Sequence, residues 1–135
     1  MISLLDTSAI LAFVRGEPGA RGVKAIIDDK EHDLVISALT LAELARRLRE
    51  LGADESCINE EVATATVFVS RVVPVNVDIA TTAFDVYAKT PKRLPIIDSL
   101  IAATAVCEGA RLIHRDRHMS AIPTDVVAQL DLTKE

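Results

Sequence analysis

Short runs of consecutive apolar residues constrain the fold of this chain more than any other feature. They lie within residues 2–5, 34–36, 72–77 and 111–115, where the polar exceptions are Ser3, Asn76, Arg111, His114 and Arg115. Runs of this length, bounded by turn residues, are expected of strands that are covered on both faces. The sequence therefore predicts a sheet that is buried between helices.

The segments between these runs are typical of helices. Apolar residues recur there at steps of three and four, and Gly52 and Gly109 provide stops. The predicted helices cover residues 8–15, 20–29, 41–51, 54–71, 79–89 and 97–108. Two helices between successive strands favour an α/β fold, a three-layer α/β/α sandwich around a mainly parallel sheet. The sheet would have four strands, or five if residues 125–130 add a short edge strand, and residues 133–135 are predicted to be frayed.

Composition limits the size and the partners of this fold. A chain of 135 residues fits one domain, spanning 1–135. Its longest apolar stretches are too short and too polar for a membrane-spanning helix, so no membrane contact is predicted. A net charge of −5 argues against general nucleic-acid binding. It does not exclude an enzyme that handles nucleic acid through bound cations.

The two cysteines indicate the compartment. Cys57 and Cys107 are far apart in the sequence, form no CxxC motif and follow no secretory leader. They are therefore interpreted as thiols in a reducing compartment, which predicts a cytoplasmic protein. Both are predicted to be packing residues.

Four acidic residues occupy comparable places in this pattern. Asp6 and Asp116 directly follow the first and fourth apolar runs, and Glu43 and Asp98 are predicted in the first turns of helices. Because the carboxyl ends of parallel strands meet at one edge of a sheet, we expect the four carboxylates to converge there. Carboxylate oxygens without a matching set of Cys or His select Mg²⁺ or Mn²⁺. Such ions can turn water into a nucleophile for attack on a phosphodiester.

Each acidic residue also has a purely structural interpretation. Asp6 and Asp98 are good helix N-caps, Glu43 could pair with Arg47 one turn later, and Asp116 suits a turn after a strand. Independent caps, however, need not gather at one edge of one sheet. Their joint placement favours a site.

Other motifs give less support to a function. The sequence contains no GxSxG, GxxxxGK[ST] or GxGxxG pattern. His114 and His118 have HxxxH spacing, but the first lies in a predicted strand and the second lies beyond a turn. They are therefore predicted to be ordinary surface or capping histidines. The loop with Lys89, Lys92 and Arg93 could contact phosphates or could simply be solvated.

Four segments together resemble the PIN-domain ribonucleases, most closely the toxins called VapC, and the resemblance covers essentially the whole chain. They are LLDTSAI, LTLAELARRL, IIDSLIAATA and LIHRDRHM. The resemblance implies that Asp6, Glu43, Asp98 and Asp116 are the catalytic residues and the ligands of Mg²⁺, with Mn²⁺ as a substitute, and that the Ser8 hydroxyl lies nearby. The family often has Thr at the position of His114, so a hydroxyl that would orient the site is missing; His114 could replace it or bring pH dependence.

The resemblance also implies a function and partners. It implies a Mg²⁺-dependent endoribonuclease toxin of a type II toxin–antitoxin system, usually a homodimer, held inactive by a small cognate antitoxin protein. One alternative is a noncatalytic PIN-fold binding module. Another is a phosphatase of the haloacid-dehalogenase type with Asp6 as nucleophile, but that pattern has a second Asp where this chain has Ser8.

Overall fold

A computed structural model describes residues 1–134 of the chain. The strands are β1 (Ile2–Leu5), β2 (Asp33–Ser37), β3 (Arg71–Val73), β4 (Arg111–His114) and β5 (Gln129–Asp131). The helices are α1 (Thr7–Val14), α2 (Ala20–Asp28), α3 (Ala38–Glu50), α4 (Glu55–Phe68), α5 (Val77–Lys89), α6 (Ile96–Glu108) and α7 (Arg117–Ser120). A single 3₁₀ turn, η1 (Leu132–Lys134), follows β5. The predicted α/β architecture is confirmed.

The five strands form one parallel sheet in the order β3-β2-β1-β4-β5. From the central β1 the chain builds β2 and β3 on one side and then returns to build β4 and β5 on the other. The order therefore reverses between β1 and β4, where Leu5 is paired with Ile113. In open parallel sheets, ligands bind outside the carboxyl ends of the strands at such a switch point.

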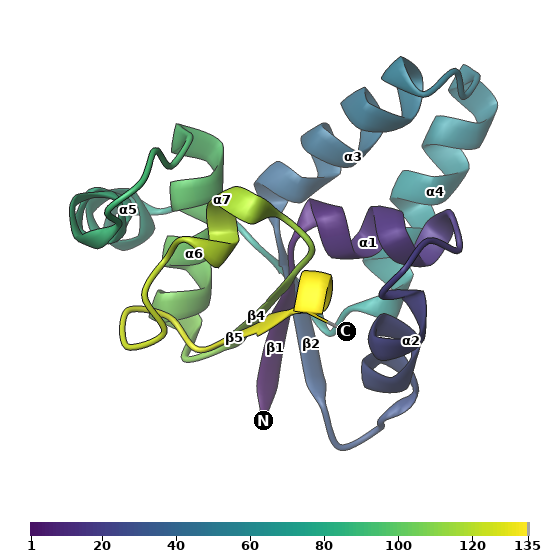
Figure 1. Cartoon of the computed structure of the whole chain (residues 1–135). Coiled ribbons are helices and arrows are strands. Elements are labelled where there is room, and N and C mark those ends of the chain that lie inside the picture. The colour runs from purple at the N-terminus through teal and green to yellow at the C-terminus, as the bar shows by residue number, and fades with distance from the viewer. Residues whose placement is uncertain (135) are drawn as a thin grey trace.

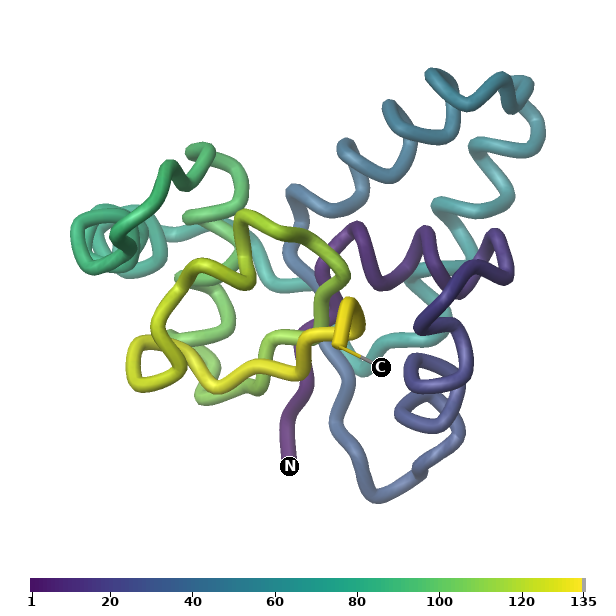
Figure 2. Tube along the Cα trace, in the orientation of Figure 1, coloured from purple at the N-terminus to yellow at the C-terminus, as the bar shows by residue number. Residues whose placement is uncertain are grey.

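Helices cover both faces of the sheet, as Figure 1 shows, with α5, α6 and α7 on one side and α1 to α4 on the other. Successive strand residues point to opposite faces. Leu4 and Leu112 are buried against the first group of helices, and Leu5 and Ile113 against the second. The Cα trace in Figure 2 shows the α3–α4 pair extending beyond the rest of the molecule. The predicted three-layer sandwich is thus confirmed, with five strands.

Several boundaries differ from the sequence prediction because local caps decide them. Helix α3 begins at Ala38, before the predicted residue 41, because the Ser37 hydroxyl accepts a hydrogen bond from the Leu39 N–H at 3.1 Å. Helix α5 begins at Val77 because Asn76 caps it. Asp78, the predicted cap, lies inside the helix.

Two strands are shorter than predicted. Strand β3 ends at Val73, directly before Pro74, which has no N–H for a sheet hydrogen bond. Of the possible edge strand at 125–130, only the last residues join β5, which runs from Gln129 to Asp131.

Two further predictions are wrong. Cys57 and Cys107 are exposed, so they are not packing residues. The frayed end is contradicted for Thr133 and Lys134, which belong to η1, whereas Glu135 lies outside the described residues. Within residues 1–134, no helix has the length and apolar character needed to cross a membrane.

Candidate functional site

The four acidic residues lie at the carboxyl edge of the sheet. Asp6 follows β1 and caps α1, Asp116 follows β4 and caps α7, and Asp98 lies in the first turn of α6. Glu43 lies in the second turn of α3 and not in the first turn, as predicted. The helix is capped by Ser37 and so begins three residues before the predicted start. The negative charges of Asp116, Asp6 and Glu43 all act on Asp98. The structure therefore brings the four carboxylates together.

Asp6 is fixed from two directions. Its backbone N–H donates to the Ile113 carbonyl at 2.9 Å, which joins the ends of β1 and β4. Its side chain accepts hydrogen bonds from the Ser8 N–H at 3.2 Å and the Ser8 hydroxyl at 2.5 Å. The same hydroxyl accepts from the Arg115 N–H at 2.9 Å. Ser8 thus ties Asp6 to the segment that leads to Asp116.

Glu43 is oriented by a neighbouring helix and not by its own. The Thr7 hydroxyl, at the start of α1, donates to Glu43 Oε1 at 2.7 Å. Arg47, the alternative partner considered from the sequence, pairs with Glu50 at 3.2 Å. The interpretation of Glu43 as half of a surface ion pair is therefore wrong.

Asp98 is not the cap of α6. Pro95 occupies the N-cap position and Asp98 is the third residue of the helix. Burial, followed by the charges of Asp116, Asp6 and Glu43, raises the pKa of Asp98 to about 7. A half-buried carboxylate among three like charges lowers the stability of the fold unless a cation joins it.

Burial is also the main reason for the raised pKa values of Asp6 and Glu43. The hydrogen bonds from Ser8 and Thr7 lower the pKa of Asp6 and Glu43 respectively, but burial outweighs them. Perturbed carboxyl groups that share one cleft edge are a recognised feature of functional sites.

His114 lies beneath the site. It is fully buried, and its Nδ1 accepts a hydrogen bond from the Asp116 N–H at 3.2 Å while its Nε2 is 2.7 Å from Gln129 Oε1. The Gln129 amide nitrogen donates to the Ile122 carbonyl at 2.9 Å, so Oε1 is the acceptor. These partners assign the proton to Nε2. His114 therefore orients the backbone at Asp116.

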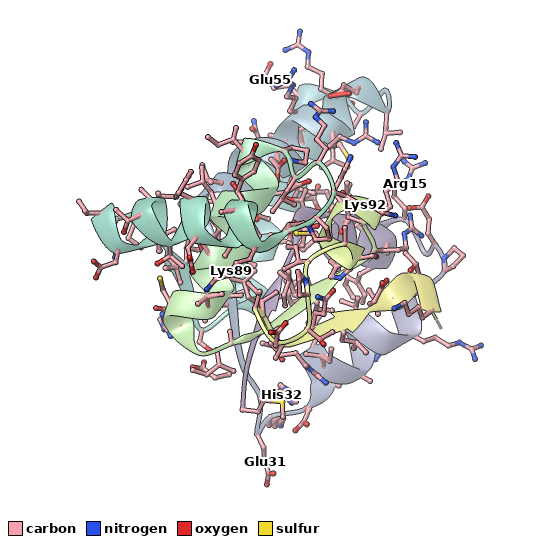
Figure 3. All side chains as sticks on the ribbon, turned by 60° about the vertical axis from the view of Figure 1, so that its left-hand side comes forward. Arg15, Glu31, His32, Glu55, Lys89 and Lys92 are labelled. Carbon is pink, nitrogen blue, oxygen red and sulfur yellow. The ribbon has the colours of Figure 1, made fainter. Side chains whose placement is uncertain are left out.

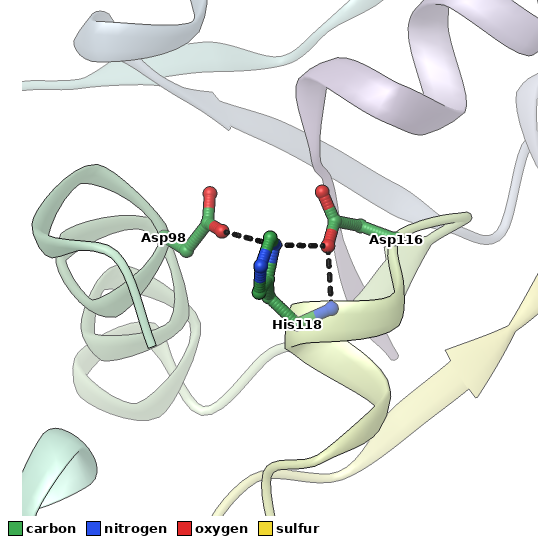
Figure 4. A group of neighbouring side chains, drawn as sticks. All are labelled: Asp98, Asp116 and His118. Carbon is green, nitrogen blue, oxygen red and sulfur yellow. Dashed lines mark hydrogen bonds and ion pairs between the residues drawn. The ribbon is translucent and has the colours of Figure 1, made fainter. Parts of the chain in front are cut away.

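His118 belongs to the site, although the sequence predicted an ordinary surface or capping residue. Figure 4 shows its ring between Asp98 and Asp116. Nδ1 lies 3.3 Å from Asp116 Oδ1 and 3.7 Å from Asp98 Oδ2. Each of the three residues offers one possible metal-binding atom, and these three atoms all lie within 4.8 Å of one another. The sequence signal was the two-residue step from Asp116, which caps the short helix that carries His118.

Basic side chains flank the acidic edge on two sides. A hollow beside Glu43 is lined by Arg46 and Arg47, and a second hollow beside Asp116 is lined by Arg115 and Arg117. In the loop considered as a phosphate contact, Lys89 pairs with Asp85 at 3.0 Å on the same helix. The flanking arginines are paired in the same way, Arg46 and Arg47 with Glu50 and Arg115 with Glu17, so what distinguishes them from Lys89 is their place beside Glu43 and Asp116.

Comparison with known proteins gives one family. The PIN domain matches residues 3–124. No curated protein sequence matches the chain.

Solved structures share the fold over nearly the full length. FitAcB from Neisseria gonorrhoeae is 27% identical, with a TM-score of 0.76 and 100% of both chains covered. VapBC-1 from nontypeable Haemophilus influenzae is 24% identical, with a TM-score of 0.73 and coverage of 98% of this chain and 99% of that chain. VapC20 from Mycobacterium tuberculosis, described as a toxin that cleaves the sarcin–ricin loop, is 20% identical, with a TM-score of 0.67 and coverage of 90% and 94%.

Proposed function

The chain belongs to the PIN domain family, and we propose that it is a metal-dependent endoribonuclease, the toxin of a type II toxin–antitoxin system. One observation carries the proposal. Four carboxylates from four separate segments meet at the switch point of a parallel sheet, and burial, followed by the like charges of the other three, raises the pKa of Asp98 to about 7.

The residues present fit a hard divalent cation. Asp6, Glu43, Asp98 and Asp116 offer the oxygen ligands that Mg²⁺ prefers, and Mn²⁺ accepts the same donors. A bound ion would supply a water nucleophile at neutral pH and neutralise charge on the phosphodiester. Positive charge at this edge would also relieve the repulsion that Asp98 experiences from Asp116, Asp6 and Glu43.

The protein's own contribution is to hold these groups in place. Ser8 fixes Asp6, Thr7 fixes Glu43, and His114 fixes the backbone at Asp116. Two of these hydrogen bonds come from the start of α1 and the third from the end of β4, so the carboxylates keep their spacing without rearrangement when substrate arrives. Such preorganisation is a large part of what an enzyme contributes to the displacement of a phosphoryl oxygen.

We propose RNA as the substrate. The arginine-lined hollows on both sides of the acidic edge support a polyanion that crosses it. A structural relative, VapC20, is described as cleaving the sarcin–ricin loop. With three Phe, one Tyr and no Trp in the chain, stacking of single-stranded bases has few partners, which favours structured RNA. Attack by water would leave a 5′ phosphate and a 3′ hydroxyl, as the resemblance to the family implies.

We further propose a small antitoxin as the regulating partner, a homodimer as the active form and the cytoplasm as the compartment. Relatives of this fold have been solved as toxin–antitoxin complexes, including one from Klebsiella pneumoniae. A basic side chain of the antitoxin would satisfy Asp6 or Asp98 in the absence of metal.

Incubation of the purified chain with structured RNA tests the proposed activity. We expect endonucleolytic cleavage with Mg²⁺ or Mn²⁺, none with a chelator, and 5′-phosphate ends in sequenced products. RNA binding without cleavage would favour the noncatalytic module. Release of phosphate from a small phosphomonoester, without RNA cleavage, would favour the phosphatase alternative.

Purification of the chain from its native operon tests the partner. We expect a small protein to co-purify and to inhibit cleavage. A free, active chain that leaves its host unharmed would contradict the toxin proposal and leave the nuclease proposal intact.

A further inference from the structure

The three histidines of the chain lie in very different surroundings. His32 lies with Glu31 at one end of the molecule, away from Lys92, as Figure 3 shows, and its Nδ1 pairs with Asp29 at 3.0 Å. His114 has both ring nitrogens engaged, with the Asp116 N–H and with Gln129. His118 alone directs a ring nitrogen at two of the four carboxylates.

We propose that His118 Nδ1 is a direct ligand of the metal ion, so that the centre combines an imidazole nitrogen with carboxylate oxygens. This inference rests on the proposed function, because it concerns the ion that the four acids would hold. The four ligands expected from the sequence are all carboxylates, with no nitrogen donor among them.

The distances suit a shared ion. In a six-coordinate site with bonds of about 2.1 Å, adjacent ligand atoms lie about 3.0 Å apart and opposite ones about 4.2 Å apart. The Nδ1 distances of 3.3 Å to Asp116 and 3.7 Å to Asp98 both fall between these values. Both distances are longer than a good hydrogen bond between nitrogen and a carboxylate. Asp98, Asp116 and His118 therefore surround a common space, and neither of the two Nδ1 contacts is a close hydrogen bond.

The backbone holds His118 in this place independently of the ring. The His118 N–H donates to Asp116 Oδ1 at 2.6 Å, and the Ser120 N–H donates to the Asp116 carbonyl at 3.0 Å. The next side chain, Met119, is fully buried in the core beneath α7. Helix α7 therefore presents Asp116 and His118 as a paired set of donors, one oxygen and one nitrogen.

A nitrogen donor changes which ions the site prefers. Mg²⁺ strongly prefers oxygen ligands, whereas imidazole is a common ligand of the first-row transition ions. Mn²⁺ also favours oxygen but, as a first-row transition ion, accepts a nitrogen donor more readily than Mg²⁺ does, so we expect His118 to contribute more to Mn²⁺ binding than to Mg²⁺ binding. Replacement of a residue that supports a metal costs at least about tenfold in affinity, and loss of a direct ligand should cost no less.

Electron spin echo spectroscopy of the Mn²⁺-loaded full chain tests the inference without measuring activity. The wild type should show ¹⁴N modulation from a coordinated imidazole, and labelling with [¹⁵N]histidine should change its frequency. His118→Gln should abolish the modulation, whereas His32→Gln, which removes the His–Asp pair at the far end of the molecule, should preserve it. The labelled wild type gives the answer even if a variant folds poorly.

Calorimetric titration with Mn²⁺ and Mg²⁺ provides the second measurement. His118→Gln should weaken Mn²⁺ binding at least about tenfold and change Mg²⁺ binding less. Stoichiometric Mn²⁺ binding that Asp98→Asn removes, without ¹⁴N modulation in the wild type, would overturn the role of His118 and leave the metal site standing. If the wild type binds no Mn²⁺ or Mg²⁺, both this inference and the proposed function are overturned.

Discussion

The two ends of the sheet each carry a histidine close to aspartate, yet the carboxyl groups respond in opposite directions. At the amino end, hydrogen bonds from His32 and from the Glu31 N–H lower the pKa of the exposed Asp29. At the carboxyl end, burial and three neighbouring carboxylates raise the pKa of Asp98 to about 7, although His118 is 3.7 Å away. Proximity to a histidine therefore does not decide the charge of an aspartate; burial and the surrounding charges do.

This difference separates a structural pair from a binding site. The Asp29–His32 pair closes the turn before β2, and the Asp29 carboxylate finds its partners, His32 Nδ1 and the Glu31 N–H, within the same turn. At the acidic edge, the charges that act on the pKa of Asp98 are the carboxylates of Asp116, Asp6 and Glu43. The edge therefore keeps an excess of negative charge. Such an edge is stabilised by an added cation, and the variants below test whether the two ends differ in this way.

The largest expected difference is in catalysis. Asp98→Asn and Asp6→Asn should each reduce RNA cleavage at least about a thousandfold, because loss of metal-derived stabilisation costs several kcal/mol in the transition state. Asp29→Asn, the matched change at the amino end, should leave the rate unchanged. Initial rates at saturating Mg²⁺ measure this. Undiminished cleavage by a folded Asp98→Asn variant would remove the proposed mechanism.

The next difference is in the response of stability to metal. At a Mg²⁺ concentration of 100 times Kd, the parent should gain about 2.7 kcal/mol by mass action, which corresponds to roughly 10 °C in melting temperature. Asp29→Asn should show the same gain and Asp98→Asn much less. Thermal melts with and without Mg²⁺ decide this, and equal shifts in all three proteins would mean that Asp98 is not a ligand.

A smaller difference is expected in the metal-free protein. The pKa of Asp98 is about 7 in the folded protein, against an ordinary value of 3.8. The free energy of unfolding therefore falls as the pH rises from 3.8 to about 7. Asp98→Asn removes this loss but also a favourable charge near the start of α6, worth about 0.3–1 kcal/mol. We expect a net gain on the order of 1 kcal/mol at pH 8 that shrinks toward pH 4. Denaturant titrations across this range measure it; a gain independent of pH would refute the electrostatic explanation.

The smallest effect concerns the amino end alone. Because the pKa of Asp29 is lowered, its contribution to stability should be present at neutral pH and lost below its ordinary pKa of 3.8. Because Asp29 is exposed, this contribution is small, so Asp29→Asn and His32→Gln should lower the melting temperature only slightly at pH 8, and the difference for Asp29→Asn should disappear below pH 3.8. A large loss of stability in either variant would show that this exposed pair does more than close a turn.

The sequence was sufficient for features that depend on strand ends. Asp6 and Asp116 could be placed because each directly follows an apolar run, and parallel strands fix which edge they share. The position of Glu43 was predicted one turn early because the start of α3 depends on the Ser37 cap. The sequence also allows Asp98 as the N-cap of α6. The helix begins at Ile96, directly after Pro95, so Asp98 lies inside its first turn.

His118 could not be found by the same reasoning. Its place in the site depends on the direction of a single short turn, α7, which is set by the Asp116 cap and by burial of Met119. Neither leaves a periodic signal in the sequence. The HxxxH spacing directed attention to His114 and His118 as a pair, whereas the structure puts one beneath the site and the other inside it.

The bridge from Ser8 to Arg115 joins residues that are 107 positions apart in the sequence. During synthesis, Asp6 and Ser8 leave the ribosome long before their partners at Ile113 and Arg115 have been made. The central pairing of β1 with β4 is therefore a late, long-range folding event. A nascent chain cannot assemble the acidic edge before residues 113–116 have been made, so the proposed nuclease would stay inert beside the ribosome until that segment has emerged.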